Sequence, residues 1–380
     1  MNNISHLTPT THNSAVRLQP AWDDQEARFA EAFQVLQAGI VDQAFPGAAV
    51  GVTHEGKLVA HKGLGRLTYD GASSAVNADT IFDLASLTKV VATTTMAMVL
   101  YEHGQLELDA PVCGVMPEIC GDDARRRDIT FRMLLAHSSG LPAYVRLFDV
   151  AKTRQDLVAA ALNTPLVGKP GTQAEYSDIG FIMLGEALER LADERLDRFC
   201  QREIFGPLGM SRTSFGVPEE WRKGIPPTED DQDFRKRIVQ GEVEDENASV
   251  MGGVAGHAGL FAPAEDLATF AHCMLNGGKP ILRRETVAVF TRREETPGET
   301  SRTLGWDTPS QPSQSGTLFS PHTFGHLGYA GTSLWIDAER GISITLLTNR
   351  TWPDRGSQKI KQVRPAFHDA IMKILLEDGK

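Results

Sequence analysis

Strand-like segments stand near both ends of the chain, with a long helical stretch between them. Apolar runs at 48–52 and 58–60 flank one short turn, and runs at 331–337 and 342–347 flank another. Apolar runs joined by short polar turns are typical of β-hairpins. Because strands at opposite ends of a chain usually meet in one sheet, we expect an antiparallel sheet built from both termini and covered by the terminal helices.

Apolar residues at helical spacing fill much of the remaining chain and predict a large all-helical insertion. The expected helices span 27–44, 86–103, 130–137, 154–162, 178–192, 194–204, 264–276 and 358–377. The fold class is therefore α/β in the α+β sense, with strands and helices segregated along the chain. The stretch 217–247 is acidic, contains prolines and has few apolar residues, which predicts a long surface excursion.

These patterns divide the chain into an expected flexible tail over 1–26, an α/β subdomain formed by 27–84 and 300–380, and a mainly helical subdomain over 85–299. The two subdomains are expected to form a single catalytic unit, with the site in the cleft between them. With 380 residues, of which 41% are hydrophobic, the chain is long enough to bury a core of that size.

Charge and composition exclude several other classes of protein. The net charge is -11 and no basic stripe is present, so we expect no nucleic-acid partner. The four cysteines show no metal-binding spacing and are expected to be reduced. No run of about 18 apolar residues is present, so no membrane span is expected. The polar stretch 1–22 lacks the features of a signal peptide, which predicts a cytoplasmic protein as written, or a periplasmic one if a leader was removed.

The first chemical motif is Ser86 and Lys89, three residues apart at the start of an apolar helix. Residues at this spacing share one face of a helix, and the helix N-terminus favours a developing negative charge on the Ser86 oxygen. Burial of Lys89 would ease the loss of its proton, so that it could accept the proton of Ser86. Taken alone, the motif is weak, and a helix-capping serine with a surface lysine is the favoured interpretation of the pair.

Two further motifs contain groups that can handle protons or contact a substrate. Tyr176 and Asp178 precede a helix, where Tyr176 could act as a phenolic base beside an ammonium, or the segment could simply cap the helix. His326 and Gly328 lie in a glycine-rich stretch that leads into the strand at 332–337, which could pair as an edge strand with an extended substrate. The alternative is an ordinary glycine-rich turn with a surface histidine.

The order and spacing of these motifs, at 86–89, 176–178 and 326–328, resemble the serine β-lactamase and penicillin-binding protein superfamily, and specifically its class C-like branch. That branch has Tyr-x-Asn as its second motif and often His-x-Gly as its third. Three stretches between the motifs are similar to the family as well, namely 129–144, 204–215 and 250–271. The resemblance extends from about residue 30 to the C-terminus.

The resemblance implies acyl transfer through Ser86, with Lys89 and Tyr176 together transferring protons to and from Ser86 and the leaving group. Which of the two is the formal base stays open. It also implies an oxyanion hole made of the backbone N–H groups of Ser86 and Tyr329. No metal or cofactor is implied. His257 is expected to have a structural or cleft-lining role, because the catalytic set is complete without it.

Two departures from the family pattern bear on the substrate. Asp178 replaces the usual asparagine, and an ionised carboxylate cannot donate a hydrogen bond to a substrate carbonyl. His326 replaces the lysine of the β-lactamases. Because the charge of a histidine depends on pH near neutrality, binding of a substrate carboxylate is expected to depend on pH as well. Gly328 is expected to let substrate approach the backbone. Asn349 and Arg350, at the end of the last strand, could compensate for the lost lysine as further substrate-binding residues, or they could simply form the polar end of that strand.

We therefore expect a serine hydrolase that cleaves a small ester, an amide or a peptide, with esterase or D-alanyl carboxypeptidase activity favoured over a dedicated β-lactamase. Neutral short-chain esters should be hydrolysed better than penicillins or cephalosporins. The alternative is a penicillin-binding sensor or scaffold that is acylated without turnover. The sequence does not indicate an oligomeric state.

Overall fold

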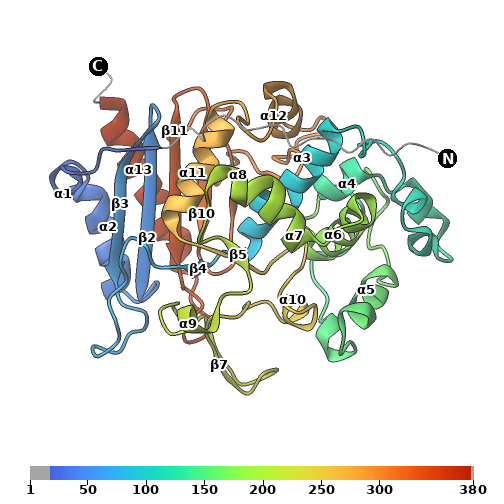
Figure 1. The fold of residues 1–380 in the computed structure, drawn as a ribbon, viewed down its shortest axis with the longest axis horizontal. Helices are drawn as coiled ribbons and strands as arrows, with labels where there is room; N and C mark the ends of the chain where they lie inside the picture. The colour runs from blue at the N-terminus through green and yellow to red at the C-terminus, as the bar shows by residue number, and fades with distance from the viewer. Residues whose placement is uncertain (1–17, 378–380) are drawn as a thin grey trace.

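The computed structural model describes residues 18–377, and its centre is a six-stranded sheet built from both ends of the chain (Figure 1). The strand order is β1-β3-β2-β11-β10-β9. The strands are β1 (Gln19–Pro20), β2 (Gly47–His54), β3 (Lys57–Gly65), β9 (Phe324–Leu327), β10 (Ser333–Asp337) and β11 (Ile342–Thr348). β2 and β11, from opposite ends of the chain, pair antiparallel at the sheet centre, as the sequence predicts.

The third motif lies on an edge strand that the sequence pattern did not reveal. β9 contains His326 and pairs antiparallel with β10, so the strand at 332–337 is internal and not an edge as expected. β9 has four residues, one of them glycine, and falls below the length at which alternation can be recognised.

Helices cover both faces of the sheet and divide its apolar side chains between two cores. α2 (Ala30–Val41) and α13 (Ile360–Glu377) pack together on one face, and α11 (Ala264–Leu275) packs against β2, β10 and β11 on the other (Figure 1). α11 lies within the range 85–299 expected for the helical subdomain, yet it belongs to the sheet layer. Its burial on both sides also joins the sheet to the helical region in one core.

The helical region contains short helices and turns that pack around α6, whose first half is almost completely buried. The remaining helices are α1 (Gln25–Arg28), α3 (Thr95–Glu102), α4 (Phe131–Leu135), α5 (Arg154–Leu162), α6 (Asp178–Ala192), α7 (Leu196–Cys200), α8 (Gly206–Leu208), α9 (Glu219–Arg222), α10 (Glu246–Val250) and α12 (Arg284–Thr291). Small sheets are formed by β4 (Phe82–Asp83), β8 (Leu260–Ala262) and β5 (Ser214–Phe215), and by β6 (Glu229–Asp231) and β7 (Arg237–Val239). Within residues 18–377, no helix is long and apolar enough to span a membrane, and the four cysteines form no disulfide.

Two sequence expectations are corrected here. The flexible tail predicted over 1–26 lies partly outside the described residues, but Gln19 and Pro20 form β1 and pair in parallel with β3. The stretch 217–247 is not purely a surface excursion, because its last residues fold back against β4. There the Glu244 N–H donates to Asp83 Oδ2 over 2.7 Å. A backbone hydrogen bond to a buried carboxylate leaves no trace in the apolar pattern from which the excursion was predicted.

Gly63 on β3 lets the loop before β4 lie against the sheet. A Cβ at this position would lie 2.3 Å from the carbonyl carbon of Asn77, which is far inside van der Waals contact. By contrast, nothing lies within 4 Å of a Cβ at Gly71, in the turn of the same connection.

We therefore expect Gly63→Ala to lower the free energy of unfolding by about 1–3 kcal/mol, the usual cost of overpacking. Gly71→Ala is the matched control and should change it by no more than about 0.5 kcal/mol. Urea unfolding followed by far-ultraviolet circular dichroism measures both. Equal stabilities for the two variants would contradict the close packing of this loop.

Candidate active site

Ser86 lies on a tight turn at the start of the long helical segment expected over 86–103. The segment is not a regular α-helix: a 3-10 turn over Ala85–Leu87 is followed by a π-helix over Lys89–Thr94, and only then by α3. Ala85 has φ 49°, a left-handed conformation that is strained for a residue with a side chain. Strained turns and π-helical segments both occur frequently at functional sites.

Contacts from distant segments hold this turn in place. Asp83 Oδ1 accepts a hydrogen bond from the Ala85 N–H over 2.8 Å, and the Thr332 hydroxyl donates to the Leu84 carbonyl over 3.0 Å. Thr88 donates to the Ala85 carbonyl over 2.7 Å. The position of Ser86 is thus fixed by β4 and by the start of β10, and not by its own helix alone.

Lys89 is fully buried, and its ammonium group is surrounded by oxygen atoms. Its Nζ lies 3.0 Å from Ser86 Oγ, 3.0 Å from the carbonyl oxygen of His257 and 2.6 Å from Asp178 Oδ1. The ammonium donates hydrogen bonds to Ser86 Oγ and to the His257 carbonyl oxygen, and Asp178 supplies the counter-charge in an ion pair. Polar groups of the first two motifs thus meet at one point, because Asp178 begins α6 and Lys89 begins the π-helix packed against it.

The charge of Lys89 differs from the sequence expectation. Burial alone would lower the pKa of Lys89, but the negative charge of Asp178 and the interaction with Tyr176 outweigh burial and raise the pKa above its ordinary value. Tyr176 is held in its neutral form, since burial raises the pKa of its hydroxyl more than the Lys89 ammonium lowers it. The resting site therefore contains an ammonium and an un-ionised phenol.

His137, which the sequence analysis did not single out, positions Tyr176. Its Nδ1 accepts a hydrogen bond from the Ser177 N–H over 3.0 Å, and its carbonyl accepts one from the Glu175 N–H over 2.8 Å. Its ring lies against Tyr176, with centroids 4.6 Å apart. Burial and the nearby cations Arg302 and Lys89 lower the pKa of His137 well below its usual range, so the ring is neutral. Its place within the family-like stretch 129–144 was the only available signal.

His326 is a buried neutral histidine and not the conditional cation expected from the sequence. Only 3% of its surface is exposed, and Nδ1 lies 2.7 Å from the Leu327 carbonyl oxygen. Because that oxygen can only accept, Nδ1 carries the proton. Burial, Lys89 and Arg302 lower the pKa of His326 well below its usual range, which leaves the ring uncharged at neutral pH.

The loop between β9 and β10 presents Tyr329 to the cavity. Gly328 is required for close packing, since a Cβ there would lie 2.6 Å from the Leu84 carbonyl oxygen. Arg350 fastens the loop: its Nε donates to the Tyr329 carbonyl over 2.7 Å, and its guanidinium lies 4.4 Å from the centre of the Tyr329 ring. The Tyr329 N–H donates no hydrogen bond to the described residues.

Arg350 and Asn349, the last two candidate substrate-binding residues, lie in different places relative to the cavity. Arg350 lines the cavity but is only 5% exposed, and its Nη1 donates to the carbonyl oxygens of Arg355 and Ser357. Asn349 does not line the cavity at all. Its amide donates to the carbonyl oxygens of Leu67 and Pro227, each over 2.9 Å, and so ties the end of β11 to two loops. The polar end of a strand was in this case structural.

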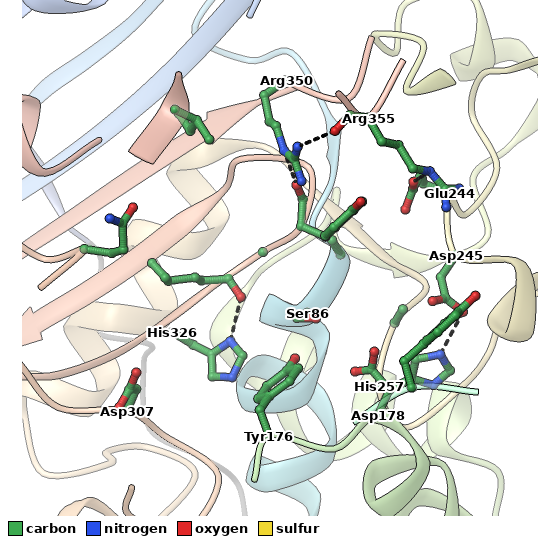
Figure 2. Close-up of a pocket in the computed structure, with 18 of the residues that line it drawn as sticks. Ser86, Tyr176, Asp178, Glu244, Asp245, His257, Asp307, His326, Arg350 and Arg355 are labelled. Carbon is green, nitrogen blue, oxygen red and sulfur yellow. Dashed lines mark hydrogen bonds and ion pairs between the residues drawn. The ribbon is translucent and has the colours of Figure 1, made fainter. Parts of the chain in front are cut away.

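Apart from the fully buried Lys89, the remaining sequence-predicted residues line one cavity of ≈ 840 Å³ between the sheet and the helical region (Figure 2). One wall includes Ser86, Tyr176 and His326, and His257 lines the cavity as expected. The His257 Nε2 lies 2.8 Å from Asp245 Oδ1. Although burial opposes it, His257 and the Ala248 N–H lower the pKa of Asp245 to about 2.

An ionic cluster that sequence reasoning missed forms another wall. Arg355 contacts Glu244, Glu246 and Glu229 over 2.7, 2.9 and 2.7 Å (Figure 2 shows the first). Burial raises the pKa of Glu244 to about 8 even though Arg355 lowers it. The sequence signal for this cluster is the acidic run in 217–247, which the composition predicts to lie on the surface.

Two further cations in the cavity wall were also missed. Arg302 lies over the Tyr176 ring, 5.4 Å from its centre, and 3.5 Å from Asp307. Arg364 of α13 is 5% exposed and donates to Gln314 Oε1 over 3.2 Å, with no carboxylate partner among the described residues. Burial and Arg350 lower the pKa of Arg364 to about 9. It is thus a buried cation without a counter-ion, at the edge of the cavity.

Comparison with known proteins agrees with this geometry. The family described as Beta-lactamase matches residues 27–365. A putative D-alanyl-D-alanine carboxypeptidase from Salmonella typhi is 31% identical over 353 residues, covering 82% of this chain and 80% of the relative.

Solved structures with the same fold include EstCE1, a hydrolase with promiscuous acyltransferase activity, with 21% identity and a TM-score of 0.75 over 92% of this chain and 100% of that one. An octameric penicillin-binding protein homologue from Pyrococcus abyssi has 22% identity and a TM-score of 0.71 over 92% and 77%.

Fold, site and relatives together define a serine hydrolase. The chain belongs to the Beta-lactamase family, within the superfamily of serine β-lactamases and penicillin-binding proteins.

Proposed function

We propose that this protein hydrolyses an ester or amide through an acyl-enzyme on Ser86, as a member of the class C-like branch. The observation that carries the proposal is the contact between the buried Lys89 ammonium and Ser86 Oγ, 3.0 Å apart, at the wall of a cavity large enough for a small substrate. Residues 86–89, 176–178 and 326–328 supply the three motifs of the branch.

Tyr176 is the general base in this proposal. Lys89 donates to Ser86 Oγ and to two other acceptors, so it has no lone pair with which to take a proton. Tyr176 first loses its own proton to solvent, and the Lys89 ammonium stabilises the resulting phenolate, which then accepts the Ser86 proton as Ser86 Oγ attacks the substrate carbonyl. Tyr176 then returns the proton to the leaving group.

The negative oxygen of the tetrahedral intermediate is stabilised by the backbone N–H groups of Ser86 and Tyr329, each worth about 3 kcal/mol in comparable enzymes. Arg350 fixes the second donor through its hydrogen bond to the Tyr329 carbonyl. Water, activated by the same Tyr176, releases the acyl group and restores Ser86.

Esterase or carboxypeptidase activity is favoured over that of a dedicated β-lactamase. Asp178 accepts from Lys89 and cannot donate to the acylamide carbonyl of a β-lactam. His326 is neutral and supplies no charge for a substrate carboxylate. Neutral esters need neither a hydrogen-bond donor from Asp178 nor a positive charge from His326, so they remain good substrates.

Arg364 favours a second substrate class, peptides with a free carboxylate. Within the described residues its guanidinium donates a hydrogen bond to Gln314 alone, and a substrate carboxylate would supply the missing counter-charge. The name of the Salmonella typhi relative agrees with such a substrate. Selection against β-lactams then depends on Asp178 more than on His326.

A penicillin-binding sensor or scaffold would be acylated without turnover. The complete set of Ser86, Lys89 and Tyr176, together with an open cavity, favours turnover instead. Continued product release after the first equivalent of substrate distinguishes the two.

The first prediction concerns the nucleophile. Ser86→Ala should lower kcat for a p-nitrophenyl ester by roughly three orders of magnitude or more and abolish covalent labelling by a fluorophosphonate. Thr88→Ser, two residues away, is the control. Its hydroxyl takes no part in the reaction, so this variant should still be labelled by the fluorophosphonate. Turnover by Ser86→Ala at the parent rate, with an unchanged circular dichroism spectrum, would contradict the acyl-enzyme mechanism.

The second prediction concerns Asp178 and pH. The negative charge of Asp178 raises the pKa of Tyr176, which must lose its proton to act as base. Asp178→Asn removes that charge, so the phenolate forms more easily and the acidic limb of kcat/KM against pH should move to lower pH. Glu175→Gln removes an exposed neighbouring charge and should leave the profile in place. A shift to higher pH in Asp178→Asn would contradict the assignment of Tyr176.

The third prediction concerns Arg364. Arg364→Met should lower kcat/KM for a D-alanyl-D-alanine peptide roughly 10- to 100-fold, the cost of one charged hydrogen bond, and leave a neutral p-nitrophenyl ester nearly unchanged. Lys373→Met removes a charge from the exposed side of the same helix and serves as the control. An equal loss on both substrates would show that Arg364 has only a structural role.

A further inference from the structure

His61 on β3 is a buried histidine with an unused nitrogen. Its side chain is 8% exposed, and Nε2 makes no hydrogen bond to any described residue. The nearest carboxylate atom, Asp79 Oδ1, is 3.9 Å away, which is too long for a hydrogen bond. A buried polar atom without a partner requires a physical explanation.

A second carboxylate completes a cluster around this nitrogen. Ligand atoms of His61, Asp79 and Glu265 all lie within 4.8 Å of one another. They come from β3, from the loop before β4 and from the first turn of α11. None of the three lines the Ser86 cavity, so the cluster is separate from the proposed catalytic residues.

Two glycines bring these elements together on one face of the sheet. Gly51 is the cross-strand partner of His61, and a Cβ there would lie 2.9 Å from the Ala264 carbonyl oxygen at the start of α11. Gly63, two residues beyond His61 and on the same face, similarly admits the backbone of Asn77. Two sheet positions beside His61, one on the adjacent strand and one further along β3, therefore carry no side chain.

The imidazole itself is held in place from the other side. The Trp22 ring packs edge-on against it with centroids 5.4 Å apart, and the backbone N–H of His61, which fixes the strand and not the ring itself, donates to Gln25 Oε1 over 2.8 Å. In contrast, Asp79 and Glu265 are exposed, with the Asp79 side chain 61% accessible, so both can rotate towards Nε2. One fixed nitrogen and two adjustable carboxylates form the cluster.

We propose that His61, Asp79 and Glu265 bind one zinc ion. Zinc accepts imidazole nitrogen and carboxylate oxygen at about 2.0–2.2 Å in tetrahedral geometry, with water in the fourth position. An imidazole ligand disfavours magnesium and calcium, which prefer oxygen donors. The bound ion would connect β3, the loop before β4 and α11, and would give Nε2 its missing partner.

The proposal is tested with zinc alone. Chelator-treated protein, dialysed against a roughly tenfold molar excess of Zn²⁺ and then against buffer, should retain about one equivalent by atomic emission and melt at a higher temperature. His61→Gln and Glu265→Gln should each lose the equivalent and the rise in melting temperature. His103→Gln, on an exposed residue after α3, should behave as the parent.

Binding of zinc by His61→Gln with parent stoichiometry would place the ion elsewhere and overturn the proposal. Absence of retained zinc in the parent would do the same. Because His61 is buried, Asp79→Asn provides a check on an exposed ligand: it should weaken zinc binding roughly tenfold or more without altering the melting temperature of the metal-free protein.

Discussion

The buried ammonium of Lys89 organises the active site. A charge inside a protein is tolerated only when its hydrogen bonds are satisfied and a counter-charge is near. Ser86 Oγ, the His257 carbonyl and Asp178 Oδ1 meet both conditions. Burial and this charge together lower the pKa of His326 and keep it neutral, and the same ammonium can stabilise a phenolate at Tyr176.

The fold assembles these groups from distant parts of the chain. Ser86 and Lys89 follow β4, Tyr176 precedes α6, and Tyr329 follows the edge strand β9. Short-range devices then fix each of them: the left-handed Ala85 turns Ser86 outward, His137 holds the backbone on both sides of Tyr176, and Arg350 clamps Tyr329. The site thus depends on backbone hydrogen bonds that involve few of the catalytic side chains themselves.

The sequence allowed prediction of the sheet, of most long helices and of Ser86, Lys89 and Tyr176 as one site, because apolar periodicity and motif order are local signals. It did not allow prediction of charge states. Burial alone pointed to a lowered pKa for Lys89, whereas the position of Asp178 reverses the direction.

Long-range pairings were also inaccessible from the sequence. Arg364 and the Arg355 cluster enter the cavity from segments that show only ordinary surface composition. Asn349 was placed in the site because a strand end was expected to face it, but its amide is occupied by Leu67 and Pro227. The zinc ligands His61, Asp79 and Glu265 are too far apart in the chain to form a recognisable spacing.

The central claim is that Lys89 remains an ammonium while the enzyme is active. Nitrogen-15 NMR of lysine-labelled protein, with the Lys89 signal assigned by its loss in Lys89→Met, measures this directly. The account predicts an ammonium signal from about pH 6 to about pH 9, with no titration across that range. A Lys89 signal that titrates near neutral pH would contradict it and would make Lys89, instead of Tyr176, the base.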